Sequence, residues 1–226
     1  MNTWRNGLRW WGLIVTAALA AGTQACLVPP FSCLDDARLA GKGKVELTPF
    51  YSAIGSMSGG ESSHGQDDLG VQSFVGVARS LDLGVRYEYL HHSASGEYDT
   101  DQSAHTLAAG PKFSVVTDRV ALSLPVGFAF GEDIVTSGTW KFIPTVILTL
   151  PAAKALDVNL SAKALISLHR NGGDPGYAVN LGLGIRPGNH SLVIRPEIGG
   201  LFYPGGGGYN YHLSVGLSYR FGLKAA

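Results

Sequence analysis

From Lys44 onward, apolar and polar residues alternate in stretches of about eleven residues, each followed by a break. A period of two is typical of β-strands with one apolar face, and no stretch in this region keeps the 3.6-residue period of a helix. The alternation predicts ten strands, over residues 44–54, 70–80, 81–92, 104–116, 120–130, 139–150, 156–168, 177–186, 190–202 and 209–221.

The connections between these strands alternate in length. Longer polar segments cover 55–69, 93–103, 131–138, 169–176 and 203–208, and tight turns lie at 80–81, 117–119, 151–155 and 187–189. An even number of strands joined in this way predicts an antiparallel up-and-down meander with every long loop at one end.

The two faces of the predicted strands differ in bulk. In 120–130 one face is bulky and apolar, while the other consists of Ala121, Ser123, Pro125, Gly127 and Ala129. A soluble barrel, which is the alternative, would carry charged residues outside and bulky ones inside. Bulky residues toward lipid and small ones toward a narrow lumen instead predict an all-β fold, a ten-stranded antiparallel up-and-down transmembrane β-barrel over residues 44–221.

The first 25 residues have the pattern of a signal peptide. Arg5 and Arg9 form a basic start, an apolar stretch follows, and Thr23-Gln24-Ala25 offers a small-x-small cleavage site. Residues 1–25 are therefore predicted to direct export and to be removed.

Two short segments flank the barrel. Residues 26–43 are predicted to be a periplasmic lead-in, and 222–226 a C-terminal tail. Cys26 and Cys33 in the lead-in allow two interpretations: lipidation of Cys26, or a Cys26–Cys33 disulfide in an oxidising periplasm.

Charge narrows the function classes. The 17 basic and 17 acidic residues of the 226-residue chain leave no basic excess to bind nucleic acid. The connections that are longer than the tight turns are predicted to form the outer loops, which are still short. These loops are acidic and contain Glu61, Asp67, Asp68, Glu97, Asp99, Asp101, Glu132, Asp133 and Asp174. The histidines show no metal-ligand spacing, and neither a metal nor a cofactor is expected.

Charged residues also occur on the inner face of the predicted strands. By strand parity they are Lys44, Glu46, Asp82, Arg86, Glu88, Lys112, Lys141, Asp157, Lys163, Arg186, Arg195, Glu197 and Arg220. They predict either a paired network that fills a narrow lumen or a weakly anion-selective pore for small solutes. The expected core of this network is Arg86, Glu88, Lys112, Lys163, Arg195, Glu197 and Arg220.

The last predicted strand carries a motif. Ser214, Gly216, Tyr219 and Phe221 match the polar, glycine and two aromatic positions of a C-terminal assembly signal, so the chain resembles bacterial outer-membrane β-barrel proteins. The resemblance implies insertion by the barrel-assembly machinery into the outer membrane of a Gram-negative bacterium. Both termini would be periplasmic, and the partners would be outer-membrane lipids and lipopolysaccharide. A non-enzymatic structural or narrow-pore barrel is the favoured function.

An enzymatic alternative rests on His91-His92-Ser93. The His-x-Ser pair resembles that of the outer-membrane lipid A deacylases. The resemblance implies an acyl hydrolase in which His91 is the base, Ser93 the nucleophile and Glu97 the orienting acid.

Overall fold

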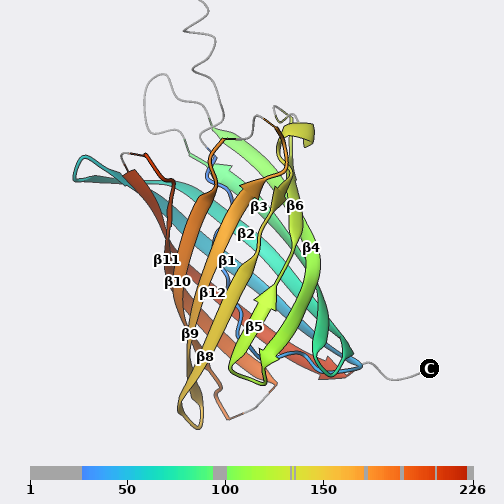
Figure 1. Ribbon diagram of the computed structural model, residues 1–226. Coiled ribbons are helices and arrows are strands. Elements are labelled where there is room, and N and C mark those ends of the chain that lie inside the picture. Colours follow the sequence, from blue (N-terminus) through green and yellow to red (C-terminus); the bar gives the residue numbers. More distant parts are fainter. Residues whose placement is uncertain are drawn as a thin grey trace, which may run out of the picture.

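The computed structural model describes residues 27–93, 101–132, 134, 136–170, 173–188, 191–206 and 208–222. Twelve strands and one short 3₁₀ helix, η1 (Thr136–Gly138), follow one another along the chain (Figure 1). The strands are β1 (Lys44–Ser58), β2 (Glu61–Ala78), β3 (Leu81–His92), β4 (Gln102–Val116), β5 (Val120–Ser123), β6 (Val126–Phe130), β7 (Lys141–Phe142), β8 (Thr145–Ala153), β9 (Leu156–Ser167), β10 (Gly176–Ile185), β11 (Leu192–Phe202) and β12 (Gly208–Gly222).

The sheet closes on itself as an antiparallel barrel with ten strand positions. β1 pairs with β2 on one side and with β12 on the other, from Lys44 opposite Gly222 to Ser58 opposite Gly208. β5 and β6 both pair with β4, and β7 and β8 both pair with β9, so each couple occupies one position in the ring. Pro125 and Pro144 interrupt these two positions, because proline has no N–H to donate to a ladder. The predicted ten-stranded barrel is confirmed.

The prediction of a long loop over 55–69 is wrong. β1 and β2 continue past the expected ends and form one long hairpin around Gly59-Gly60, whose φ angles are 61° and 88°. Two-residue hairpin turns of this kind need positive φ at both positions, which glycine adopts without strain. The residues here are mostly polar on both faces, so the alternation that marks the other strands is lost. Asp67 and Asp68 therefore lie in a strand and not in an acidic loop, and Asp68 is buried.

Most large apolar side chains of the strands point outward. Exposed examples from across the ring are Leu69, Val85, Val115, Val146, Leu181, Ile198, Leu213 and Tyr219. Polar residues of the alternate positions, such as Thr48, Gln72 and Asn180, are buried inside. The predicted assignment of faces is therefore the observed one. Among the described residues, no helix is long and apolar enough to cross a membrane.

Residues 27–43, which we call the lumen segment, run inside the barrel. Val28 is hydrogen-bonded to Gln66 near the end of the barrel that holds the Gly59-Gly60 turn, and Ala40 is hydrogen-bonded to Asp82 near the opposite end. The described part of the segment 26–43, predicted as a periplasmic lead-in, thus lies in the lumen. Its apolar residues Phe31, Leu34, Ala37 and Ala40 are buried and recur every third position, which is neither a strand nor a helix period.

The two ends of the described chain consequently lie at opposite ends of the barrel. Gly222 pairs with Lys44, at the start of β1, whereas the lumen segment enters beside Gln66. The prediction that both termini lie at one, periplasmic, end differs from this arrangement, in which Val28 and Gly222 lie at opposite ends of the barrel. Within the ring itself, the start of β1 and the end of β12 lie side by side.

Candidate functional site in the barrel lumen

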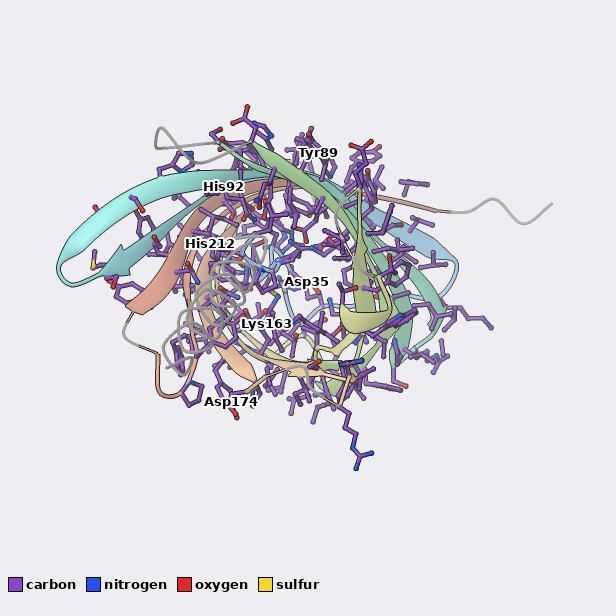
Figure 2. All side chains as sticks on the ribbon, turned by 90° about the horizontal axis from the view of Figure 1, so that it is seen from above. Asp35, Tyr89, His92, Lys163, Asp174 and His212 are labelled. Carbon is purple, nitrogen blue, oxygen red and sulfur yellow. The ribbon has the colours of Figure 1, made fainter. Side chains whose placement is uncertain are left out.

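The first part of the lumen segment lies in the upper lumen, the end that holds the Gly59-Gly60 turn, and packs there through apolar contacts. The ring of Phe31 meets that of His212 edge-on, with centroids 4.8 Å apart, and packs with Leu165 and Leu201. Its carbonyl oxygen accepts a hydrogen bond from the side-chain amide of Asn180 at 3.1 Å. His212 lies inside the ring of strands, whereas Tyr89 projects from its outside (Figure 2). Strands β9 to β12 thus form one wall for the start of the segment.

The middle of the segment is held by its backbone. The carboxylate of Glu197 accepts hydrogen bonds from the N–H groups of Cys33 and Leu34, at 2.6 and 2.8 Å. Gln72 donates from the other side to the Leu34 carbonyl, at 3.0 Å. Arg86 donates to the Ser32 carbonyl at 2.9 Å and is ion-paired with Glu88. Because these groups satisfy a segment that has no strand partner here, they replace the ladder that a buried backbone otherwise needs.

Below this level the segment is ion-paired with the barrel wall. Asp35 accepts from Lys112 at 2.8 Å, and Asp36 from Arg195 at 3.1 Å. Asp35, Asp36, Lys112 and Arg195 are all buried. Arg38 is paired in turn with Asp157 on β9. The segment therefore crosses the lower lumen with two acidic residues followed by one basic residue, and each is ion-paired with a wall residue of opposite charge.

A second layer of ion pairs supports the first. Arg195 also contacts Glu46 at 3.0 Å, and Arg220 donates to the other oxygen of Glu46, also at 3.0 Å. Arg186 pairs with Asp157. Sequence reasoning placed these side chains in the lumen but missed Asp35, Asp36 and Arg38, which several of them contact.

The predicted network residues Arg86, Glu88, Lys112, Lys163, Arg195, Glu197 and Arg220 occupy inward strand positions. The structure brings most of them to the lumen segment rather than to one another. Of the seven, Arg86 and Glu88 form an ion pair with each other. Lys163 donates a hydrogen bond to the Ser32 carbonyl at 2.7 Å, and Figure 2 shows it inside the ring of strands.

A cavity of about 730 Å³, the lumen cavity, remains beside the segment. Its wall on β4 to β6 is built from the small side chains of Ala104, Ala108, Gly110, Ser123, Gly127 and Ala129. The charged residues that line it are Asp35, Arg86, Glu88, Lys141 and Lys163. The cavity exists because small residues face the lumen on these strands while the segment follows the opposite wall.

The cavity is closed toward the lower lumen. Cys33 and Ala37 pack there with Ala121 of β5 and Ile147 of β8 in a buried apolar cluster. The Asp35–Lys112 ion pair lies at the same level of the segment. At the other end the lining includes Leu27, the first residue of the lumen segment, and Ile134, Gly138 and Tyr203 from the connections at the loop end. The lumen is thus filled below and hollow above.

The other predicted residues lie elsewhere. Ser214 is buried and hydrogen-bonded to Ser52 at 2.7 Å, and Gly216 faces Thr48 and Leu34. Tyr219 and Phe221 stack on the outer surface with centroids 6.1 Å apart. Cys33 is buried in the lumen, while Cys26 lies outside the described residues.

Of the three predicted catalytic residues, the structure describes His91 and Ser93. His91 stacks on Tyr89, with centroids 6.4 Å apart, and the Ser93 amide donates to the carbonyl of Gly65. No hydrogen bond joins His91 to Ser93, and Glu97 lies outside the described residues, as do Asp99 and Asp133. The described residues also contain no group of three metal-ligating side chains.

Comparison with known proteins gives structural similarity alone. No protein-family model matches the sequence, and no curated protein matches it. The attachment invasion locus protein Ail of Yersinia pestis is 12% identical, with a TM-score of 0.40 over 80% of this chain and 99% of that one. The translocator domain of the autotransporter NalP from Neisseria meningitidis is 11% identical, with a TM-score of 0.43 over 80% and 89%. A de novo designed transmembrane β-barrel is 8% identical, with a TM-score of 0.38 over 80% and 97%. The assignment of this chain as a closed β-barrel rests on its own strand pairing.

Proposed function

We propose that this chain is a non-enzymatic outer-membrane β-barrel protein of a Gram-negative bacterium, with a lumen that its own N-terminal segment keeps closed. Insertion by the barrel-assembly machinery and contact with outer-membrane lipids and lipopolysaccharide belong to the same proposal. Of the structural and narrow-pore roles, the structural barrel is the better supported.

The outer surface supports the membrane location. A closed ring leaves no unpaired strand edge, and its outward side chains are apolar around the whole circumference. Aromatic side chains form a stacked outer cluster at the loop end, with Tyr89, His105, Phe130, Phe128 and Trp140 in successive contact. Rings at this position are typical of the interface between lipid tails and headgroups. The C-terminal motif, in which Tyr219 and Phe221 face outward, agrees with delivery to the outer membrane.

The observation that carries the closed lumen is the paired lower half of the lumen segment. Asp35, Asp36 and Arg38 bind wall residues on β4, β11 and β9. Removing a charged partner from such a pair leaves an uncompensated buried charge, which costs about 3–5 kcal/mol. An ion passing through the lumen would have to displace several such pairs at once.

Planar-bilayer recording tests this proposal. We expect no conductance steps from the intact barrel, and steady steps from a variant that lacks residues 27–40. The triple variant Asp35→Ala, Asp36→Ala, Arg38→Ala keeps the segment but removes its charges, and we expect it to open intermittently. Each protein is first checked for heat-modifiable mobility on a gel, which reports a folded barrel. An intact barrel that conducts steadily, with a selectivity that shifts in Lys163→Gln, would overturn the closed lumen in favour of a small-solute porin.

The non-enzymatic part of the proposal has its own test. Cells that express the protein should retain full-length lipid A, and Ser93→Ala should leave its mass spectrum unchanged. Shortened lipid A that returns to full length in Ser93→Ala and in His91→Ala would establish an acyl hydrolase instead.

A further inference from the structure

The lumen cavity has a largely apolar lining that also contains charged side chains. Its apolar lining includes Leu90, Ile143, Ile147 and Leu165, from four different strands or connections around the barrel. The second oxygen of Glu88, Oε2, has no hydrogen-bond partner in the described part of the chain, but each of the two acidic groups is ion-paired, Glu88 with Arg86 and Asp35 with Lys112. The basic groups Lys141 and Lys163 are not.

Neither lysine has a carboxylate within ion-pair distance among the described residues. The Lys163 ammonium donates one hydrogen bond, to the Ser32 carbonyl at 2.7 Å. The side chain of Lys141 has no hydrogen bond or ion pair to a described residue. An ammonium group has three protons to donate, so each lysine retains donors for another partner.

The strand register places both lysines along one face of the cavity. Lys141 of β7 lies opposite Ser167, near the loop end of β9. Lys163 precedes Ser167 by four residues on the same inward face of β9. Four residues of strand span about 13 Å. One cation is therefore near the loop end of the cavity and the other is deeper, beside the lumen segment.

We propose that the lumen cavity binds an amphipathic monoanion, a carboxylate or sulfonate on a compact apolar body, with its anionic group at Lys163. The apolar body lies against Ile147, Leu165 and the small-residue wall of β4 to β6. Lys141 meets the anion first, as it enters from the loop end. A volume of about 730 Å³ is in the range of pockets that hold one small organic ligand.

A cation or a neutral molecule fits the same cavity less well. A bound cation would lie near two ammonium groups that have no carboxylate partner within the described chain, whereas each carboxylate of the cavity already has a cationic partner. A neutral apolar molecule would fill the space but leave both lysines without a counter-charge, although buried charges are stable when paired. An anion with an apolar body satisfies both requirements.

Isothermal titration calorimetry on the folded barrel in lipid nanodiscs tests the proposal. The probe is naphthalene-2-carboxylate, the neutral comparison is naphthalene-2-carboxamide, and empty nanodiscs give the lipid background. We expect one carboxylate per barrel and at least tenfold weaker binding of the amide. The double variant Lys141→Gln, Lys163→Gln should also weaken carboxylate binding at least tenfold and leave amide binding unchanged.

Two further variants make the test specific. Lys44→Gln, Lys154→Gln removes the same number of charges at exposed positions outside the cavity and should bind the carboxylate normally. Thr106→Phe fills the cavity without changing its charge and should abolish binding of both probes. Equal affinity for the two probes, or carboxylate binding that survives either the inner lysine substitutions or Thr106→Phe, would overturn the proposal. The inference rests on the plugged lumen but not on its conductance, so a barrel that neither conducts nor binds the carboxylate would refute the ligand site and leave the closed barrel intact.

Discussion

The lower and upper halves of the lumen differ in how completely the N-terminal segment fills them. Both must fill the inside of a ten-stranded ring whose inward side chains are largely small or polar. In the lower half, Asp36 and Arg38 bring charges that match Arg195 and Asp157 on the wall. In the upper half, the segment follows one wall through Phe31, and the space beside β4 to β6 stays open.

The difference follows from the residues that each half presents. Where the wall carries long charged side chains, a segment with complementary charges is ion-paired with it. Where the wall carries alanine and glycine, as at Ala108 and Gly127, no side chain is long enough to reach the segment. Stability is therefore expected to reside in the lower half, and the capacity to bind a ligand in the upper half.

The comparison is tested most strongly at the buried ion pair of Lys112. Lys112→Gln leaves Asp35 buried without its cation, so we expect the free energy of unfolding to fall by about 3–5 kcal/mol. Urea titration in detergent micelles, followed by the fluorescence of Trp140, measures the change. Arg119→Gln, in an exposed turn, is the matched control and should change stability by less than about 0.5 kcal/mol. A loss as small as that of the control would mean that the lower half is not the stable one.

A smaller effect is expected at Glu197, between the two halves. Glu197→Gln keeps the shape of the side chain but replaces a charged acceptor of the Cys33 and Leu34 N–H groups by a neutral amide. Hydrogen bonds to charged groups contribute about 1.5–3 kcal/mol, and the amide retains part of this, so a loss of about 1–2 kcal/mol is expected in the same urea titration. A loss as large as that of Lys112→Gln would extend the stable half upward to this level.

The barrel itself was predictable because its signal is local. Alternation along each strand gave the number of strands, the inner and outer faces and the inward charges such as Glu46 and Arg195. The hairpin around Gly59-Gly60 was not predictable in this way, because its strands are polar on both faces there and show no alternation.

The lumen segment was missed for a different reason. Its fold depends on contacts with residues more than a hundred positions away, such as Asp36 with Arg195, and no local period reports them. One signal was present: the inward positions carried more basic than acidic residues, and Asp35 and Asp36 lie just before the first strand. Buried basic residues in excess need acidic partners, and Asp35 and Asp36 are such partners.

The smallest effect is expected at Lys163, in the upper half. Lys163→Gln removes a cation that has no carboxylate partner, in contrast to Lys112, and the amide can still donate to the Ser32 carbonyl. The cost of burying that charge disappears and a charged hydrogen-bond donor is replaced by a neutral one, so the free energy of unfolding should change by no more than about 1 kcal/mol in either direction. The same substitution at two inward lysines thereby separates the halves: a large loss at Lys112, where the charge is paired, and almost none at Lys163. A loss at Lys163 equal to that at Lys112 would show that this cation is paired within the protein, and the upper half would then have no charge left to offer a ligand.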